Sequence, residues 1–280
     1  MGIENAMFMK KMVQLCGDGW LMGWHERNAG NLSYVLDEDD VWGVEASFAT
    51  EGQHHAWRPL DVKADALAGR FLVVSGAGRL FRNAADDPQG TFGIVEFAES
   101  GDSYRIVWGL RGGRPTSEFP THVIAHEARL AATQGASRVV YHAHTPNVIA
   151  LSNILEPDSR TWTRALWRTM TEAVLFFPEG VGVVPWMVPG GREIAVASGE
   201  LLQNFPACVW TQHGLFATGA SCDDAFGLAH MIEKTASIYL QGRAACGGQE
   251  PPFHVSDAQL LQICLESGVT PNGDFLGSRA

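Results

Sequence analysis

The fold is decided by residues 91–144, TFGIVEFAESGDSYRIVWGLRGGRPTSEFPTHVIAHEARLAATQGASRVVYHAH. Two apolar runs at its start, TFGIVEF and SYRIVWG, are separated by a short polar stretch and predict a β-hairpin. After PTSEFP the pattern predicts a helix over about 119–133, capped by Thr116 or Ser117. RVVYHAH at 138–144 predicts another strand. Strand pairs with short turns that alternate with helices indicate a largely antiparallel sheet covered by helices.

The rest of the chain repeats this alternation. The patterns predict helices at 5–22, from Pro146, at 159–171, at 191–204, from Asp223 to about Tyr239 and from Ser256, and strands at 31–36, 71–75, 173–177, 181–185, 207–212 and 214–218. The buried face of the first helix is expected to comprise Met9, Met12, Val13, Leu15, Trp20 and Leu21. The stretch 38–70, which includes His54, is expected to be an irregular surface excursion. We therefore predict one α/β domain over residues 1–280.

Composition narrows the possible partners. The chain has 280 residues, 46% of them hydrophobic, with a formal net charge of -11. Such an acidic protein repels nucleic acid and anionic membranes, so neither is expected as a partner. The five cysteines are widely spaced and form no CxxC pair, which is typical of reduced thiols in a cytoplasmic protein. We expect no membrane-spanning segment, because no apolar run is long enough.

Three histidines form a candidate metal site. His142 and His144 lie two residues apart at the end of a predicted strand, so both side chains project from one face. His213 ends another apolar strand and is followed at once by Gly214. Three neutral imidazoles suit zinc and leave a coordination position open for a substrate. Two buried, hydrogen-bonded histidines without a metal are the alternative that spacing alone leaves open.

A second histidine pair competes with the first. His122 and His126 are spaced i, i+4 on the helix after PTSEFP, which is also compatible with a shared metal. No Glu directly follows His122, so the HExxH pattern of zinc proteases is absent. We therefore favour a structural role for this pair.

Glu118 is the candidate acid. It lies between Pro115 and Pro120, which restrict the backbone on both sides and make the turn rigid. A rigid turn is a suitable platform for a catalytic carboxylate. The alternative from the residues alone is a Glu that only stabilises the start of a helix through its dipole.

Three polar turns can bind an oxyanion through backbone and side-chain donors. They are RNAGN with Asn28, Gly30 and Asn31, the glycine turn SGAG with Ser75 and Gly76, and the helix start with Thr116 and Ser117. Gly, Asn and Ser turns are common, so each signal is weak by itself. Together with an acid and a metal site they make a phosphorylated substrate plausible.

Six stretches carry a resemblance to a known family. They are WLMGWHERNAGNLS (20–33), FLVVSGAGRLFRN (71–83), IVWGLRGGRPTSEFPTH (106–122), VVYHAHTPNVIAL (139–151), FFPEGVGVVPWMVPG (176–190) and QHGLFATG (212–219) with the following DDAFGL. In this order they resemble the class II aldolases, a family that includes fuculose-phosphate aldolase and ribulose-phosphate 4-epimerase. WHERNAGN and GVGVVPWMVPG are similar to the rhamnulose-phosphate branch.

The resemblance implies a site and an activity. It implies a homotetramer with one Zn2+ per subunit, held by His142, His144 and His213, and retro-aldol cleavage of L-rhamnulose 1-phosphate to dihydroxyacetone phosphate and L-lactaldehyde. Glu118 matches the family's catalytic glutamate, and Glu172 matches an acid that reaches a neighbouring subunit's site. The family's contacts to phosphate and dihydroxyacetone fall on Asn28, Gly30, Asn31, Ser75, Gly76, Thr116 and Ser117.

This mechanism has the zinc stabilise an enediolate while Glu118 shuttles the proton at C3. A Schiff base is the other route, but none of Lys10, Lys11, Lys63 and Lys234 stands in a recognisable site. Fuculose-type relatives use tyrosines at the aldehyde end, and NGDFLGSRA at 272–280 has none, so that proton donor stays open.

Other functions on this scaffold remain alternatives. They are another sugar-phosphate aldolase, an epimerase or dehydratase, and a non-enzymatic module like the adducin head. The adducin-like module is disfavoured because the histidine triad and the acid are all present. Cupins also use HxH, but they are nearly all strand, and the predicted helices argue against them.

Overall fold

The computed structural model describes residues 2–49 and 55–277. The helices are α1 (Met7–Leu21), α2 (Glu38–Trp42), α3 (Pro88–Thr91), α4 (Phe119–Ala132), α5 (Pro146–Leu151), α6 (Ser159–Trp167), α7 (Ala173–Phe176), α8 (Arg192–Leu202), α9 (Cys222–Ala245) and α10 (Asp257–Ser267). The strands are β1 (Asn31–Val35), β2 (Arg58–Pro59), β3 (Phe71–Ser75), β4 (Phe92–Phe97), β5 (Ser103–Gly109), β6 (Val139–Ala143), β7 (Gly182–Val184), β8 (Ala207–Trp210) and β9 (Gly214–Gly219).

These strands form one nine-stranded sheet in the order β2-β5-β4-β3-β1-β6-β9-β8-β7. Every neighbouring pair is antiparallel except β7 with β8. The predicted α/β class with a largely antiparallel sheet is therefore confirmed. The extent of one domain over residues 1–280 stays a prediction.

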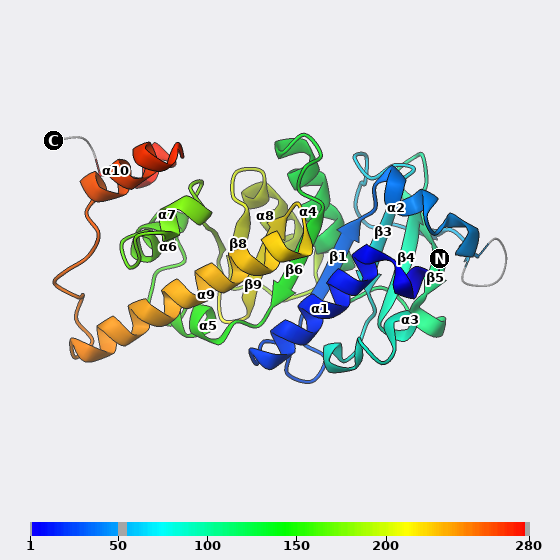
Figure 1. The fold of residues 1–280 in the computed structure, drawn as a ribbon, viewed down its shortest axis with the longest axis horizontal. Helices are drawn as coiled ribbons and strands as arrows, with labels where there is room; N and C mark the ends of the chain where they lie inside the picture. Colours follow the sequence, from blue (N-terminus) through cyan, green and yellow to red (C-terminus); the bar gives the residue numbers. More distant parts are fainter. Residues whose placement is uncertain (1, 50–54, 278–280) are drawn as a thin grey trace.

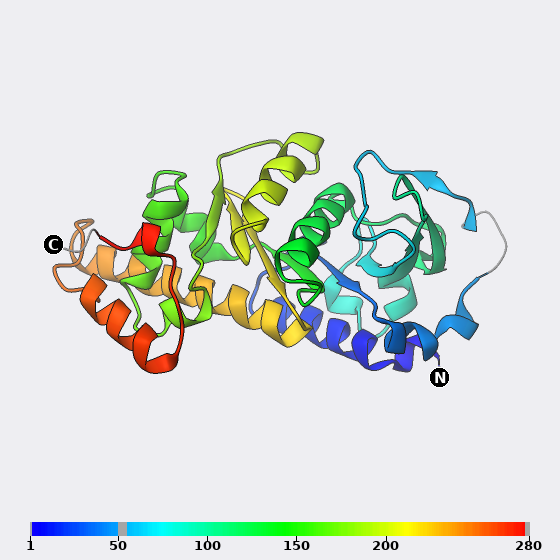
Figure 2. The ribbon, with the colours of Figure 1, turned by 90° about the horizontal axis from the view of Figure 1, so that it is seen from above.

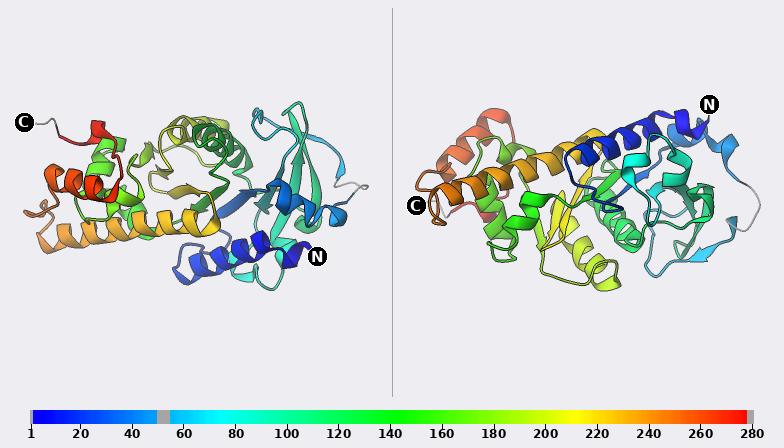
Figure 3. Two further views of the ribbon diagram at one scale, coloured as in Figure 1. Left: turned by 45° about the horizontal axis from the view of Figure 1, so that its top comes forward. Right: turned by 90° about the horizontal axis from the view of Figure 1, so that it is seen from below.

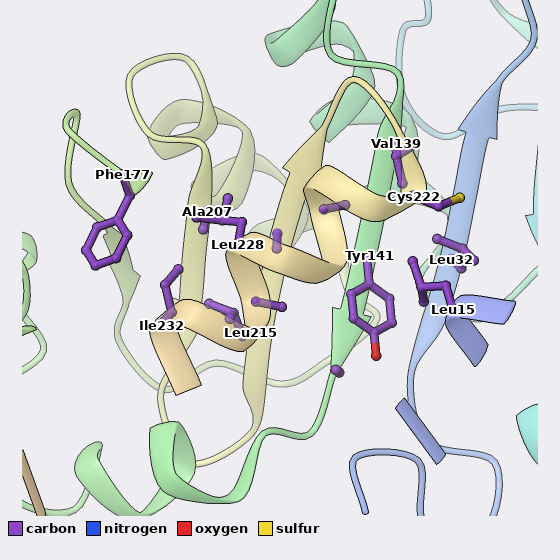
Figure 4. Close-up of a cluster of buried hydrophobic side chains, with 14 of the residues drawn as sticks. Leu15, Leu32, Val139, Tyr141, Phe177, Ala207, Leu215, Cys222, Leu228 and Ile232 are labelled. Atoms are coloured by element: carbon purple, nitrogen blue, oxygen red, sulfur yellow. The ribbon is translucent and has the colours of Figure 1, made fainter. Parts of the chain in front are cut away.

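Helices cover both faces of the sheet. The long helix α9 runs along one face with α1 and α5 beside it, and α4 and α8 lie against the other (Figures 1, 2 and 3). On the first face, Leu228 and Ile232 of α9 lie near Leu215 of β9, and Tyr141 of β6 belongs to the same buried cluster (Figure 4). Burial of these side chains fixes α9 against β6 and β9, the strands that lead to the histidines.

Most predicted elements are present, and capping chemistry sets several of their ends. Helix α9 begins with a capping box in which Ser221 and Asp224 each accept from the other's backbone N–H. Helix α10 begins with the same device, built from Ser256 and Gln259. Helix α9 continues six residues beyond the predicted end at Tyr239, to Ala245, because a helix tolerates the single Gly242 of QGRAA, and the Gly247-Gly248 pair comes only after Cys246.

Three predictions about the elements are wrong. Residues 173–177, predicted as a strand, form the short helix α7, because a short apolar run does not by itself distinguish strand from helix. The helix predicted over 159–171 ends at Trp167. Helix α4 is not capped by a hydroxyl: Glu118 is the N-cap residue, and no side chain makes a capping hydrogen bond there.

The predicted buried face of α1 is correct except at its end. Met9 and Met12 are fully buried, but Trp20 is 37% and Leu21 is 83% exposed. The buried stripe continues instead through Cys16 and Gly19, which follow Met12 at helical spacing. In the described part of the stretch 38–70, α2, a 3-10 turn at Glu45–Ser47 and β2 are all short, and the other described residues are irregular. His54 lies outside the described residues.

Two further observations concern bonding and membranes. All five cysteines are free, and four of them are buried. Among the residues that the structure describes, no helix combines the length and the apolar character needed to cross a bilayer.

Candidate metal centre and active site

Three histidine side chains meet at one end of β6. One ring nitrogen each of His142, His144 and His213 lies within 4.8 Å of the other two. The ring centroids are 4.8–5.3 Å apart. His142 and His144 share a face because they are two apart on β6, as the sequence predicts. His213 joins them because β9 pairs with β6 in a register that sets His142 opposite Phe216.

The turn that carries His213 is held in place by Gln212 and Gly214. Gln212 adopts a left-handed backbone conformation, with φ at 57°, and its backbone N–H and side-chain amide donate to Ser152 at 2.8 and 2.6 Å. A Cβ atom at Gly214 would lie 2.4 Å from the carbonyl oxygen of Ala143. Only glycine therefore allows β9 to approach β6 this closely beside the histidines.

Hydrogen bonds orient two of these imidazoles. Nδ1 of His142 lies 3.1 Å from the carbonyl oxygen of Leu215, which can only accept, so Nδ1 carries the proton. Its Nε2 is buried and has no hydrogen-bond partner in the described part of the chain. Nδ1 of His144 lies 2.6 Å from Oε1 of Glu26. Both rings thus present an unprotonated Nε2 to the same point.

This arrangement fits a metal ion. Burial and the neighbouring histidines lower the pKa of His142 well below its usual range. Burial, with His144 adding to it, lowers the pKa of His213 to about 4. His142 and His213 are therefore neutral at pH 7, and neutral imidazole is the form that binds zinc, at about 2.0–2.1 Å per Zn–N bond. A buried, unpaired Nε2 on His142 is the donor that such an ion would satisfy.

The Glu118 carboxylate faces the same group. Its Oε2 lies 3.7 Å from Nε2 of His142, and its Oε1 lies 3.9 Å from Nε2 of His213. The residue is 8% exposed. Burial raises the pKa of Glu118, while a hydrogen bond that Asn31 Nδ2 donates to Oε2 at 2.8 Å opposes the rise. A carboxyl group with a raised pKa beside a metal site is suited to acid and base chemistry near neutral pH.

Strand pairing places the predicted polar turns beside this carboxylate. Asn31 lies opposite His142 in the pairing of β1 with β6. Ser75 accepts a hydrogen bond from the backbone of β1 through Oγ, and its carbonyl accepts from Thr116 N–H at 2.9 Å. Gly76 forms an isolated bridge with Pro115. The structure therefore brings Asn31, Ser75, Gly76 and Thr116 together.

The remaining members of these turns lie nearer the surface. Asn28 and Ser117 are exposed, and Gly30 is partly exposed. Gly30 has φ at 81°, and a Cβ atom there would lie 2.3 Å from Nδ1 of His25. Buried His25 thus supports the RNAGN turn from below and requires glycine at this position.

Glu172 is not brought to the histidines by any described contact within the subunit. It is exposed at the N-terminus of α7, which packs against α9 and α10 at the far end of the molecule from α1 (Figure 1). The four lysines do not join the site either: Lys11 pairs with Asp223, and the others are exposed.

Two residues of the site were not predicted. Glu26 holds His144, but an exposed acid in a turn gives no signal by itself. Ser33 lies between His122 and His126, with Oγ 2.6 and 2.8 Å from their ring nitrogens. The metal-compatible group consists of His142, His144 and His213. It contains neither His122 nor His126, in agreement with the structural role favoured for that pair.

Comparison with known sequences gives one family match over most of the chain. Residues 10–240 match the family described as the class II aldolase and adducin N-terminal domain. Rhamnulose-1-phosphate aldolase of Pectobacterium carotovorum subsp. carotovorum (strain PC1) is 40% identical over 270 residues, 96% of each chain. The protein of the same name from Escherichia coli O7:K1 is 37% identical over the same span, also 96% of each chain.

Solved structures agree with this match. A sugar-phosphate aldolase from Thermotoga maritima superposes with a TM-score of 0.70 at 26% identity, covering 87% of this chain and 97% of its own. L-fuculose-1-phosphate aldolase from Thermus thermophilus superposes with a TM-score of 0.58 at 18% identity, covering 88% of this chain and 98% of its own. The second likeness concerns the fold alone.

Proposed function

Because the chain belongs to the class II aldolase and adducin family and is an aldehyde-lyase, we propose that it cleaves L-rhamnulose 1-phosphate to dihydroxyacetone phosphate and L-lactaldehyde. The observation that carries the proposal is the buried Glu118 carboxylate, 3.7 and 3.9 Å from the free ring nitrogens of His142 and His213. A carboxylate beside a three-histidine group suits a retro-aldol step, in which the bond between the α and β carbons of a ketose breaks and a proton is transferred to the α carbon. The choice of rhamnulose rests on the names of the relatives.

The metal is proposed to be one Zn2+ per subunit, held by His142, His144 and His213. The proximity of the three ring nitrogens and the unpaired Nε2 of His142 support this set. A bound zinc ion would act as a Lewis acid toward the ketose oxygens and stabilise the negative charge left at C3 when the C3–C4 bond breaks.

Glu118 is proposed to exchange the proton at C3. Burial raises the pKa of Glu118 above that of a free glutamate, which favours proton exchange by this carboxyl group. Asn31 donates to one carboxylate oxygen and leaves Oε1 directed toward His213 and the open side of the site. The carboxylate therefore holds a fixed orientation when the C3 carbanion has to be protonated.

The phosphate and the dihydroxyacetone half are proposed to bind along the polar turns. Asn31 links these turns to Glu118. The neutral donors of the turns come from Asn28, Gly30, Ser75, Gly76, Thr116 and Ser117. These local donors would have to bind the phosphate against the repulsion that arises from the net charge of -11. The register of β1 between β3 and β6 supports this placement.

The assembly is proposed to be a homotetramer in which Glu172 reaches a neighbouring subunit's site. The support is its exposure on α7, away from the histidines of its own subunit. We propose that the group that protonates the aldehyde oxygen also belongs to the neighbouring subunit.

The test is a direct assay. Zinc-loaded protein is incubated separately with L-rhamnulose 1-phosphate and L-fuculose 1-phosphate, and dihydroxyacetone phosphate is measured. We expect product from the rhamnulose substrate at a higher kcat/KM. Product mainly from fuculose 1-phosphate would indicate another aldolase. No product from either at full zinc occupancy would favour an epimerase, a dehydratase or an adducin-like module.

A further inference from the structure

A chain of buried polar groups runs from Glu118 into the protein. Glu118 Oε2 accepts from Asn31 Nδ2 at 2.8 Å, and Asn31 Oδ1 lies 2.5 Å from Nε2 of His122. Nδ1 of His122 lies 2.6 Å from Oγ of Ser33, which lies 2.8 Å from Nε2 of His126. The members come from β1 and α4, so the chain joins the sheet to the helix that Glu118 begins.

Both histidines of this chain are buried and neutral. His122 and His126 each have 0% of their surface exposed. Burial lowers the pKa of His122 to about 3 and that of His126 well below its usual range. Phe216 stacks on His142 and meets His122 edge-on, so it separates this chain from the metal-compatible group.

The donors in this chain can be assigned one by one. With Glu118 ionised, its oxygen only accepts, so Asn31 turns its NH2 to Glu118 and its carbonyl oxygen to His122. A carbonyl oxygen also only accepts, so His122 must carry its proton on Nε2. Neutral His122 then accepts at Nδ1 from the Ser33 hydroxyl.

The assignment continues to the end of the chain. Ser33, having used its one hydrogen, accepts in turn from His126 Nε2–H. His126 Nδ1 is then unprotonated, and it has no hydrogen-bond partner among the described residues. All four hydrogen bonds thus point toward the Glu118 carboxylate, and donors aligned in this way polarise and strengthen one another.

We propose that His122, which directs its Nε2 proton at Asn31 and accepts at Nδ1 from Ser33, is a positioning residue that acts through Asn31 to hold the Glu118 carboxylate. This inference rests on the proposed function, because Glu118 has to act on substrate for its position to matter. Among the described residues, His122 makes its one hydrogen bond to the polar turns through Asn31, and it is not a member of the metal-compatible group. It fixes which way the Asn31 amide faces, and thereby keeps an N–H donor on Oε2.

The first test reads the protons directly and needs no activity. Zinc-loaded protein labelled with 15N-histidine is examined by solid-state NMR at pH 7, and signals are assigned by their loss in His122→Gln and His126→Gln. We expect both residues to be neutral with the proton on Nε2. A proton on Nδ1 of either residue, or a positively charged ring, would overturn the proposal.

The second test measures kcat, KM and zinc content of His122→Phe and His122→Gln. Phenylalanine keeps a ring but removes the donor, and we expect kcat to fall about 10- to 100-fold with KM within about 3-fold and full zinc occupancy. The glutamine amide can donate to Asn31 in place of Nε2–H, so we expect kcat within about 3-fold of the parent. Equal activity of the two folded, zinc-loaded variants would contradict the proposal.

Two further variants guard against a purely structural explanation. Thr121→Val is the matched control, because Thr121 is the buried neighbour of His122 on α4 and its Oγ1 has no partner in the described structure. Its kcat should be unchanged. If His122→Phe does not fold, Ser33→Ala decides: we expect a lower kcat at full zinc occupancy, because His122 loses the partner that holds its ring at Nδ1, and an unchanged kcat would contradict the proposal. A parent protein inactive on both ketose phosphates but with the expected tautomers would reject the proposed function alone.

Discussion

Glu26 Oε1 lies 2.6 Å from Nδ1 of His144, across 118 residues of sequence. The glutamate side chain is 61% exposed, yet it fixes which nitrogen of His144 is free. A carboxylate behind a metal-binding histidine sets the tautomer of the ring and raises its basicity. The turn WHERNAGN therefore contributes to the histidine group as well as to the polar turns.

Replacing Glu26 should weaken metal binding without abolishing it. We expect Glu26→Gln to reduce zinc affinity about 10- to 100-fold, because His144 loses its charged partner. Competition with a chelator of known affinity measures the change. Glu4→Gln, at an exposed position of the N-terminal turn, is the control and should bind zinc like the parent. Equal affinities of the two variants would show that Glu26 does not support His144.

Removing the third histidine should remove the metal. We expect His213→Ala to hold far less than one zinc per subunit and to lose cleavage activity at the same time, since two imidazoles remain. Elemental analysis of the purified protein gives the stoichiometry. The proposed ligand set would have to be abandoned if this variant kept one zinc per subunit.

Glu118 should separate chemistry from metal binding. We expect Glu118→Gln to lower kcat about 10²- to 10⁴-fold while zinc content stays at the parent level, because the carboxylate transfers a proton and is not a ligand. Steady-state kinetics with parallel zinc analysis tests this. Near-normal turnover would assign the proton at C3 to another group.

Gly214 should be indispensable for the approach of two strands. A Cβ atom at this position would meet the backbone oxygen of Ala143 at 2.4 Å, and backbone moves less easily than a side chain. We expect Gly214→Ala to lower the free energy of unfolding by about 1–3 kcal/mol and to lower zinc occupancy.

Gly227→Ala is the matched control for this glycine. Gly227 lies within α9, with nothing within 4 Å of its added Cβ atom. We expect it to be neutral or stabilising by about 0.5–1 kcal/mol. Denaturant unfolding compares the two variants, and similar losses in both would contradict the argument from close approach.

Buried neutral histidines should make the fold sensitive to acid. Burial lowers the pKa of His25 and of His122 from 6.5 to about 3, so the unfolded chain binds these protons first as the pH falls. Stability is therefore lost as the pH drops below about 6.5, by about 1.4 kcal/mol per pH unit for each such histidine. Unfolding of zinc-loaded parent and His122→Gln at pH 7, 6 and 5 should give a slope smaller by one proton in the variant. Equal slopes would contradict this.

The sequence predicts the local part of the site and not its assembly. That His142 and His144 share a face follows from strand geometry, and that a helix begins after PTSEFP follows from its proline, although the predicted hydroxyl cap is wrong. The meeting of His213 with this pair depends on the register between β6 and β9, which no spacing along the chain contains. The resemblance to the class II aldolases, and not the spacing, predicts the association of His213 with this pair.

The unpredicted parts share one physical cause. Glu26 and Ser33 act through partners 118 and 93 residues away, and their residue types are common in turns and strands. Helix α7 also depends on distant parts of the chain. Its sequence AVLF is apolar enough for a strand, but packing against α9 and α10 stabilises it as a helix. Tertiary contacts, rather than local preference, determine these features.

Strand β1 alternates its side chains, with Asn31 and Ser33 in the polar chain and Leu32 in the hydrophobic core. A one-residue slip of β1 would exchange these two faces completely. The consequence concerns how the gene can change. The insertion or deletion of one residue in the preceding turn can leave the register of β1 unchanged. The same change inside Asn31–Ser33 would direct the polar side chains into the core and a leucine toward Glu118. The register of β1 against its neighbours therefore constrains the sequence as strictly as the identity of any single residue of the site.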